Sequence, residues 1–408
     1  MREEKPTQSI TSRLKIVIYA HDFLPVIGGV QTHVELLARG LTKFHGIEGS
    51  PEFEIIVVTN TPAGAFDDNC FSFRVVRNPT VSELVRLIRK TQVLHVTGPA
   101  LLPLLLARLF RRPTVVEHHG YQAICPNGLL LHEPDRAVCP GHFQAGRLGE
   151  CFRCQCSELS SARRSLFRLV LTKMRNVLCR HVENIAVTKH VQNREALPRS
   201  RVIYHGIEDV LMGKSDVSAG LSIPKKVCFA YVGRLVFEKG VGVLLNAASQ
   251  LQKEGCEFDI ILIGDGPERA GLDRQITRLG LESRVRITGF LGGPELSSLL
   301  QQVHVVVMPS VWEETAGLSA IEQMMRGRLV IASAIGGLAE VVGDAGVVCP
   351  PGDAEALAAS MSSVIAHPEQ IATFGIKARA RCLSVFGYER MLKEHAEVYR
   401  RAAAEPRV

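Results

Sequence analysis

The chain has 408 residues, of which 46% are hydrophobic and 22% are charged. This length and composition are typical of two globular domains. The formal net charge of +7 suits phosphate-bearing ligands or an anionic membrane surface and is too small to indicate nucleic-acid binding. No apolar run approaches the roughly 20 residues that span a bilayer, and the polar segment 1–15 lacks the apolar core of a secretory signal. We therefore expect a cytoplasmic protein.

Apolar, β-branched runs of strand length alternate with longer amphipathic stretches along the chain. This alternation is typical of a parallel sheet covered by helices on both faces, so we expect two doubly wound α/β domains. The predicted strands of the first domain are residues 15–20, 54–59, 93–96 and 114–119, and those of the second are 227–233, 258–264, 284–289, 304–310 and 328–333.

The predicted domain boundary lies in residues 214–226, which are polar and rich in Ser, Gly and Lys. Such a composition is typical of an exposed linker. We expect an amino-terminal Rossmann-like domain at residues 1–210 and a second Rossmann-like domain at 211–385. A C-terminal helix at 386–408 is expected to pack back on the first domain.

Residues 120–160 interrupt the alternation with several prolines and glycines and five of the chain's 11 cysteines. We interpret this segment as an inserted loop without strand or helix, and long loops of this kind are often functional. Cys151 and Cys154 have the separation that lets two thiolates bind one Zn²⁺. Structural zinc, disulfides and free thiols remain open for the cluster. The predicted zinc ligands are Cys125, Cys139, Cys151 and Cys154, with Cys156 or His142 as a substitute.

Residues 162–182 predict a basic amphipathic helix, because apolar residues recur at helical spacing among six Arg and Lys residues. Such a helix either lies on an anionic membrane or presents an ordinary solvated basic face. The apolar residues of the pattern are Leu166, Leu169, Val170, Val177 and Leu178.

Paired glycines, Gly28 and Gly29, follow the first predicted strand and precede an amphipathic run. Glycines at this place let backbone N–H groups approach a ligand at a helix N-terminus, where the partial positive charge favours anions. A tight strand-to-helix turn is the competing interpretation.

The first strand of the second domain is followed by Gly233, Arg234 and Lys239. The guanidinium and the ammonium can converge on one diphosphate, and ligands of open α/β sheets bind at the carboxyl ends of the strands. Gly264 begins a Gly-Asp-Gly-Pro-Glu turn after the next strand. We interpret this turn as structural first and ligand-lining second, with Pro267 near the first position of the next helix.

Glu314 and Glu322 lie at the start of a helix predicted after strand 304–310, Glu314 just before it and Glu322 within it. Two carboxylates roughly 12 Å apart along a helix axis cannot share one proton or one metal. They could hold two parts of an elongated ligand, with the N–H groups of the helix N-terminus facing a phosphate. An ordinary exposed helix glutamate is the alternative for Glu322.

The run E-T-A-G-L-S-A-I-E at 314–322 resembles the E-x7-E motif of family 4 glycosyltransferases, which are retaining enzymes with the GT-B fold. The resemblance implies two Rossmann-like domains facing across a cleft. It also implies metal-independent and cofactor-independent sugar transfer from a UDP-, GDP- or ADP-sugar to a glycan, lipid-linked or small-molecule acceptor, as in polysaccharide or lipopolysaccharide biosynthesis. The other matches, in order, are Gly28-Gly29-Val30, His118-His119-Gly120, Gly233-Arg234 with Lys239-Gly240, and Gly336-Gly337-Leu338-Ala339-Glu340-Val341-Val342.

The resemblance implies a role for each matching residue. Arg234 and Lys239 would stabilise the donor diphosphate, a form of electrostatic catalysis. Glu322 would hold the nucleotide ribose and Glu314 the hydroxyls of the transferred sugar, with His119 near that sugar. The acceptor would attack the leaving-group face of the sugar, and a phosphate oxygen would take its proton. The other implied donor-binding residues are Gly28, Gly29, Gly233, Gly264, Gly317 and Leu318.

The sequence departs from the family pattern at two places. Thr315-Ala316 stands where many members carry an aromatic residue, and His205-Gly206 stands where many carry Asn-Gly. A nucleotide-sugar epimerase of the same fold and an inactive glycan- or nucleotide-binding homologue are the alternative functions. A phosphorylase is disfavoured because no lysine motif for pyridoxal phosphate is evident, and the lack of an Asp-x-Asp sequence argues against a metal-dependent transferase fold.

Overall fold

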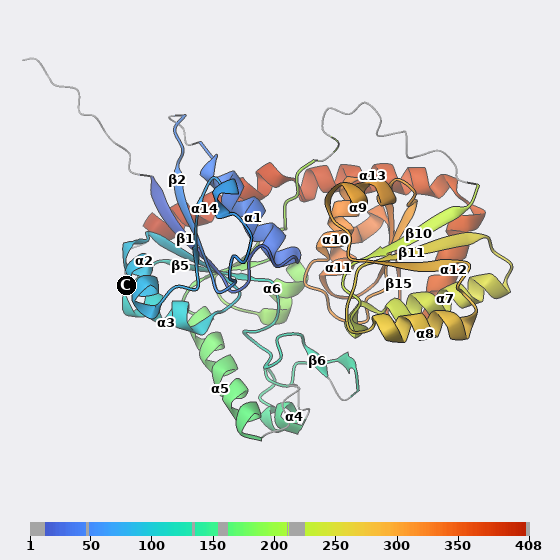
Figure 1. Cartoon of the computed structure of the whole chain (residues 1–408). Coiled ribbons are helices and arrows are strands. Elements are labelled where there is room, and N and C mark those ends of the chain that lie inside the picture. The colour runs from blue at the N-terminus through green and yellow to red at the C-terminus, as the bar shows by residue number, and fades with distance from the viewer. Residues whose placement is uncertain are drawn as a thin grey trace, which may run out of the picture. The chain divides into compact units, whose positions relative to one another are not determined.

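The computed structural model describes residues 13–45, 49–132, 135–153, 162–209, 211 and 225–404. Most of the predicted tail at 1–15, most of the predicted linker at 214–226, and Cys154 and Cys156 lie outside these residues. Two parallel sheets with helices on their faces form the described chain (Figure 1), which confirms the predicted α/β class.

The first sheet has seven strands in the order β3-β2-β1-β4-β5-β8-β9. Val and Ile dominate its inner strands, as expected for strands covered on both faces. The strands are β1 (Leu14–Ala20), β2 (Phe53–Thr59), β3 (Arg74–Arg77), β4 (Val93–Thr97), β5 (Thr114–His118), β8 (Glu183–Ala186) and β9 (Ser200–Val202). The helices in this part of the sequence are α1 (Gly29–Thr42), α2 (Val81–Lys90), α3 (Leu101–Leu109), α5 (Ala162–Cys179) and α6 (Lys189–Glu195).

The second sheet has six strands in the order β12-β11-β10-β13-β14-β15. Its strands are β10 (Val227–Val232), β11 (Phe258–Ile263), β12 (Val285–Gly289), β13 (Val305–Met308), β14 (Leu329–Ser333) and β15 (Val347–Cys349). Its helices are α7 (Val241–Lys253), α8 (Arg269–Leu279), α9 (Gly293–Leu300), α10 (Leu318–Met325), α11 (Gly336–Val342), α12 (Ala354–Ala366) and α13 (Glu369–Val385), and α14 (Tyr388–Ala404) follows.

Two apolar layers cover the second sheet. Helices α7, α8 and α12 pack on one face around Phe229 and Phe258. Helices α9, α10, α11 and α13 pack on the other face around Ala230 and Ile261. Successive residues of β10 therefore point into different layers, as the period of two in a strand requires.

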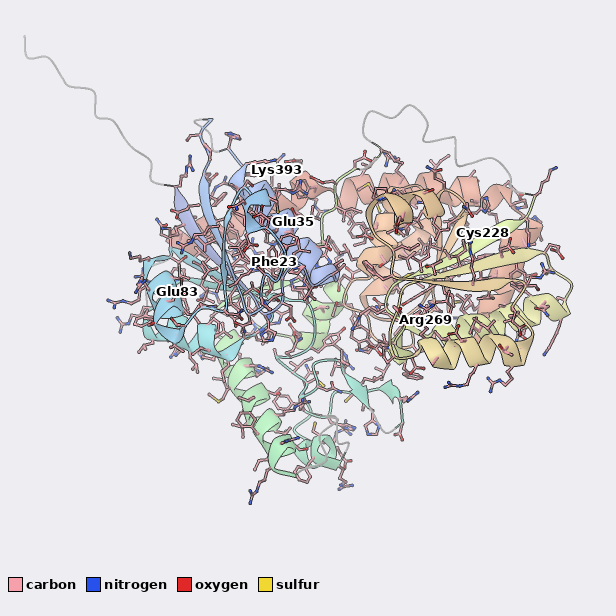
Figure 2. All side chains as sticks on the ribbon, viewed as in Figure 1. Phe23, Glu35, Glu83, Cys228, Arg269 and Lys393 are labelled. Atoms are coloured by element: carbon pink, nitrogen blue, oxygen red, sulfur yellow. The ribbon has the colours of Figure 1, made fainter. Side chains whose placement is uncertain are left out.

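The backbone divides into two compact units, one of residues 1–117 with 392–408 and the other of residues 118–391. In the first unit, Phe23 is fully buried and Lys393 of α14 is exposed (Figure 2). This division does not test the boundaries predicted at 1–210, 211–385 and 386–408, which stay predictions.

Residues 120–160, which were predicted to form a loop without strand or helix, contain both. Residues Leu131–His132 (β6) and Ala137–Val138 (β7) form an antiparallel pair, and Leu148–Arg153 form helix α4. Both elements are too short to produce a readable hydrophobic period, which is why the sequence pattern missed them. The described part of the insertion is therefore folded.

The predicted basic helix is present as α5, but its apolar residues are not all in the core. Leu169 is buried, whereas Leu166, Val170 and Val177 are exposed. Figure 1 shows why: α5 projects from its unit with α4 beside it, so much of its surface has no neighbour among the described residues.

Candidate active site

The order in which strands are added to the second sheet reverses between β10 and β13, which are parallel neighbours. The chain builds outward from β10 through β11 to β12 and then returns to place β13 on the other side of β10. In open α/β sheets, the loops at the carboxyl ends of two such strands diverge and leave room for a ligand. The loops after β10 and β13 are the ones that carry Arg234, Lys239 and Glu314.

Lys239 and Glu314 are in direct contact at this point. Lys239 ends a short 3-10 turn, Phe237–Lys239, and its Nζ lies 2.9 Å from Oε1 of Glu314. The hydroxyl of Ser310 donates to the same carboxylate oxygen. The side chains are only 16% and 4% exposed, so this ion pair is largely shielded from water. The structure thus joins two residues that the sequence assigned to different parts of the donor.

Glycines bring the two loops together. Gly240 has φ +66°, and a Cβ there would lie 2.0 Å from the carbonyl oxygen of Pro309. The backbone N–H of Val311 also donates to the carbonyl of Glu238. A residue with a side chain at position 240 would push the β10 and β13 loops apart and separate Lys239 from Glu314.

A second pair of glycines packs beneath Glu314. A Cβ on Gly336 would lie 2.5 Å from the carbonyl oxygen of Glu314, and one on Gly337 would lie 2.2 Å from that of Thr315. The backbone N–H of Gly337 donates to the Glu314 carbonyl at 2.6 Å. The Gly336-Gly337 turn therefore supports the backbone that presents the Glu314 carboxylate.

Helix α10 begins immediately after this loop, with Gly317 as its left-handed N-cap. Glu314 lies before the helix and Glu322 within it, as predicted. Burial raises the pKa of Glu322, and nearby Arg326 offsets part of that effect. The N–H groups of Leu318 and the next residues have no carbonyl partner within the helix, so the N-terminus of α10 is suited to bind an anion.

Arg234 is exposed, and its backbone is held by the Tyr231 hydroxyl, which donates to the Arg234 carbonyl at 2.7 Å. Gly233 packs against Gly264, where a Cβ would lie 1.8 Å from the Gly233 carbonyl oxygen at φ +150°. Gly264 therefore has a packing role. Pro267 lies before Glu268, the N-cap of α8, so its predicted place near the first helical position was wrong by two residues.

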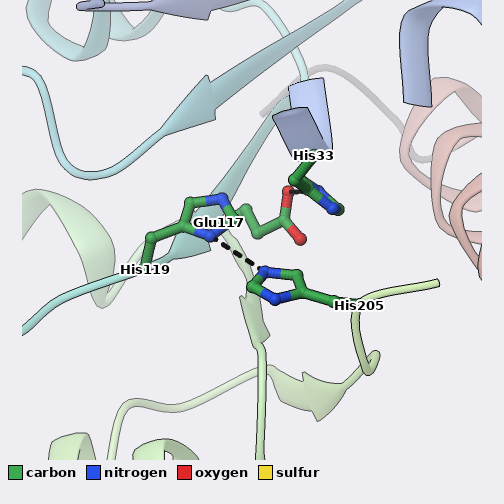
Figure 3. A group of neighbouring side chains, drawn as sticks. All are labelled: His33, Glu117, His119 and His205. Carbon is green, nitrogen blue, oxygen red and sulfur yellow. Dashed lines mark hydrogen bonds and ion pairs between the residues drawn. The ribbon is translucent and has the colours of Figure 1, made fainter. Parts of the chain in front are cut away.

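His119 lies beside the Glu314 loop, because the hydroxyl of Thr315 donates to the His119 carbonyl at 3.2 Å. Its Nδ1 is 3.2 Å from Nε2 of His205, and the two rings stack with centroids 5.3 Å apart (Figure 3). Sequence reasoning noted His205 only as a departure from Asn-Gly. The histidine in place of asparagine at position 205 is the sequence feature that could have indicated this contact with His119.

Gly28 and Gly29 belong to the other compact unit. Gly28 is the N-cap of α1 with extended backbone, and Gly29 is the first residue of the helix. In the same unit, His33 of α1 lies 2.9 Å from the buried carboxylate of Glu117 (Figure 3). The strand, glycine turn and helix predicted around Gly28 are present.

Both cations and both glutamates of the site fall within residues 216–381, which match the family described as Glycosyl transferases group 1. These residues of the chain are similar to that family. His119, the other residue of the candidate site, precedes the matched residues.

Among the proteins similar to this chain is 2-deoxystreptamine glucosyltransferase of Streptomyces kanamyceticus, which is 35% identical over 35% of the chain and 37% of the relative. Glycogen synthase of Mycobacterium tuberculosis is 34% identical over 41% of each protein. D-rhamnosyltransferase WbpZ of Pseudomonas aeruginosa is 32% identical over 39% of the chain and 41% of the relative. The chain thus matches about two fifths of the length of these relatives.

Solved structures resemble nearly the whole chain in fold. HepE from Anabaena in complex with UDP has a TM-score of 0.70 and 20% identity and covers 95% of this chain and all of its own. WaaG, described as a glycosyltransferase of lipopolysaccharide biosynthesis, has a TM-score of 0.65 and 14% identity over 94% of this chain and 99% of its own. At this identity the likeness concerns the fold, and it confirms the predicted GT-B architecture.

The described cysteines of the insertion do not gather into a metal site. Cys125, Cys139 and Cys151 are buried, and none of the cysteines in the described ranges belongs to a group of three or more candidate metal ligands. Burial raises the pKa of the Cys125 thiol, which donates to Asn127 at 2.9 Å. The predicted ligand Cys154 and the substitute Cys156 lie outside the described residues.

One cavity of about 590 Å³ lies at the opposite, amino edge of the second sheet, between the starts of β10, β11 and β12. Lys226 and Arg284 in its wall are already paired with Asp259 and Glu257. None of the predicted site residues lines this cavity. The candidate site is therefore the loop cluster at the carboxyl edge.

Proposed function

We propose that this chain is a retaining glycosyltransferase that moves a sugar from a nucleotide-sugar donor to a glycan, lipid-linked or small-molecule acceptor. The observation that carries the proposal is the shielded Lys239–Glu314 pair. It lies at the carboxyl ends of β10 and β13, where the strand order of the second sheet reverses. It places a fixed cation and a hydroxyl-binding carboxylate side by side, which is what a sugar diphosphate needs. The sugar transferases among the relatives and the UDP-bound structural neighbour support this assignment.

Lys239 and Arg234 would neutralise the donor diphosphate. Lys239 pairs with Glu314, so the diphosphate would compete with this carboxylate for the ammonium. Glu314 would then accept hydrogen bonds from the sugar hydroxyls. The N–H groups of Gly317 and Leu318 would face a phosphate at the start of α10.

The remaining donor contacts follow from the placement of each residue. Glu322 on α10 would bind the ribose hydroxyls, with Gly233 and Gly264 giving the backbone close access. Gly28 and Gly29 are assigned to the phosphate side by the resemblance alone. We assign His119 to the sugar side, next to the Glu314 loop.

In the transfer step, the bond between the sugar C1 and the diphosphate oxygen breaks and a bond between C1 and the acceptor oxygen forms on the same face. The acceptor hydroxyl proton passes to the departing phosphate oxygen, so the step needs no protein base. Lys239 and Arg234 stabilise the negative charge that develops on the leaving group. No metal ion is needed, because these two side chains supply the positive charge.

A nucleotide-release assay with UDP-, GDP- and ADP-sugars tests the proposal. We expect release of one nucleoside diphosphate, rising when the correct acceptor is present, with the new glycosidic bond in the donor's anomeric configuration. An isomerised donor recovered without transfer would instead indicate an epimerase. Binding without turnover across broad donor and acceptor panels would indicate an inactive binding homologue and would sink the transferase assignment.

The domain assignment and the cofactor expectation belong to this proposal. We assign acceptor binding to residues 1–210 and donor binding to 211–385, with 386–408 returning to the first of these. A structural zinc held by Cys125, Cys139, Cys151 and Cys154 stays a prediction. Elemental analysis of the reduced, purified protein tests it, and absence of zinc would reject it.

We propose that α5 contacts an anionic membrane surface, which would bring the enzyme to a lipid-linked acceptor at the cytoplasmic face. Leu166, Phe167 and Val170 are 59%, 62% and 49% exposed, and residues 162–182 carry six Arg or Lys residues and no Asp or Glu. An exposed apolar stripe beside basic side chains suits an interface with anionic lipid. None of the helices in the described ranges is long and apolar enough to cross a membrane.

Vesicle flotation tests this contact. The wild-type chain should float with vesicles containing phosphatidylglycerol and not with phosphatidylcholine alone, and Phe167→Asp should reduce flotation. The matched control is Ile376→Asp on α13, another exposed apolar residue, which should float as the wild type does. Equal flotation of both variants, or none by the wild type, contradicts the proposal.

A further inference from the structure

We propose that the insertion positions Glu314 through a donor-loop latch, which we define as Tyr121, Leu129, Arg194, Trp312 and Glu313. The inference rests on the proposed role of Glu314 in binding the transferred sugar. It assigns the insertion a part in sugar binding that neither the motifs nor the family match includes.

The first half of the latch holds the two residues that precede Glu314. The indole N–H of Trp312 donates to the carbonyl of Leu129 in the insertion. The hydroxyl of Tyr121 donates to the carbonyl of Glu313 at 3.1 Å. The rings of Tyr121 and Trp312 meet edge to face with centroids 6.4 Å apart. The backbone on the amino side of Glu314 is therefore held by side chains and carbonyls at positions 121 and 129.

Tyr121 is suited to this contact because it is a permanent donor. Its side chain is fully buried, and burial raises the pKa of Tyr121, with Glu313 adding to that effect. The hydroxyl therefore keeps its proton and continues to donate to the Glu313 carbonyl. Loss of this hydroxyl would leave a buried carbonyl without that partner.

The second half of the latch is an ion pair from α6. Nε of Arg194 donates to Oε2 of Glu313 at 2.9 Å, and Nη2 of Arg194 donates to the carbonyl of Cys139 at 2.7 Å. One planar guanidinium thus ties the donor loop to the insertion, a geometry that lysine cannot reproduce. Nε2 of His190 lies 3.7 Å from the same Glu313 oxygen. Gln144 secures α6 itself by donating to the Arg194 carbonyl.

The residue after Glu314 is held from the same side. Thr315 donates its hydroxyl to the carbonyl of His119 and accepts a hydrogen bond from the Thr188 hydroxyl at its own carbonyl, at 2.7 Å. Positions 312, 313 and 315 are thus all bonded to residues 119–129 or to α6 and its N-cap. The Glu314 carboxylate faces Lys239, whose Nζ also lies 5.8 Å from the centroid of the Trp312 ring. The position of this carboxylate is consequently set by the insertion as well as by the sheet.

Trp312 is the only tryptophan of the chain, so its fluorescence reports on the latch without a ligand. We expect Arg194→Met to raise acrylamide quenching of Trp312 about twofold, because the latch loses two charge-assisted hydrogen bonds, one to Glu313 and one to the Cys139 carbonyl. Arg194→Lys should fall between the variant and the wild type. The control is Arg199→Met, which breaks an ion pair with Glu183 between the same atom types in the same unit. Equal quenching of Arg194→Met and Arg199→Met overturns the latch.

A binding comparison tests whether the latch serves the sugar. Calorimetry would use the most tightly bound of the UDP-, GDP- and ADP-sugars and its free nucleoside diphosphate. We expect Tyr121→Phe to weaken the nucleotide sugar about three- to tenfold and the free nucleotide less than about twofold, the scale of one hydrogen bond. Tyr19→Phe is the control, since it removes a hydroxyl bonded to Asn60 in the other unit. Equal weakening of both ligands overturns the sugar role.

The two measurements separate the inference from the proposed function. A wild-type chain that binds none of the three nucleotide sugars counts against the proposed function. The Trp312 quenching comparison still decides in that case whether Arg194 holds the donor loop. A change in quenching without a difference between nucleotide and nucleotide sugar would reject sugar positioning by the insertion.

Discussion

The Lys239–Glu314 pair gives the sharpest prediction, because both its energy and its role follow from one contact. At 2.9 Å and an effective dielectric of about 20, two unit charges attract by about 6 kcal/mol before desolvation is subtracted. Loss of one partner leaves a shielded charge unpaired, which costs about 3 kcal/mol. Lys239→Met should therefore lower the free energy of unfolding by about 3 kcal/mol. Adding Glu314→Gln should restore roughly half of that loss, because the unpaired charge is removed.

Trp312 lies in the same compact unit as the Lys239–Glu314 pair. Urea unfolding followed through its fluorescence therefore measures the free energy of unfolding of that unit. The control is Lys226→Met: its ion pair with Asp259 is similarly short, but the side chains are 38% and 45% exposed, so it should cost less than about 1 kcal/mol. In the nucleotide-release assay, Lys239→Met should lose about 10²- to 10³-fold in turnover. The reasoning fails if Lys239→Met is as stable as Lys226→Met, if the double variant is no better than the sum of the singles, or if turnover stays within a few-fold of wild type.

Three further predictions concern the same loops. Gly337→Ala should destabilise the fold by more than about 2 kcal/mol and weaken donor binding, because its Cβ would overlap the Thr315 carbonyl. Thermal unfolding measures this loss. The control Gly149→Ala should show no loss, because its Cβ would meet nothing within 4 Å. Glu322→Gln should raise the melting temperature at neutral pH, because burial raises the pKa of Glu322 and its charge costs stability above that pKa. The same variant should abolish nucleotide binding. A melting temperature at or below the wild-type value contradicts the burial argument. Burial raises the pKa of Glu313, but hydrogen bonds from His190 and Arg194 outweigh it and hold that pKa below the ordinary 4.5. This stabilisation is present above pH 4.5 and is lost as the pH falls through the lowered pKa, so Glu313→Gln should flatten the acid loss of stability; an unchanged pH profile of urea unfolding would refute it.

The strand pattern of this chain was readable from sequence because its inner strands are covered on both faces. Runs 54–59 and 258–264 each contain four Val, Ile or Leu residues, and each coincides with a strand of the structure. Short strands such as β3 and β9 were not predicted. Three or four residues form a strand only where a neighbour offers hydrogen bonds, which composition does not report.

The position of the site was predictable for a related reason. Strand ends are visible in sequence, and parallel strands put their carboxyl ends at one edge, so Lys239 and Glu314 were expected at the same edge. Their direct contact was not expected. It depends on the close approach of two loops at Gly240, which a list of motifs does not describe.

By itself, the sequence determined the two α/β sheets, the order of their inner strands along the chain and the residue types available to a sugar diphosphate. Those properties depend on local periodicity and on residue chemistry. Only the tertiary structure decided that Lys239 pairs with Glu314, that the insertion is folded, and that Tyr121 and Arg194 hold the loop carrying Glu314. These contacts join residues far apart in sequence, and their formation depends on backbone approach and side-chain direction, which are settled when the whole core packs.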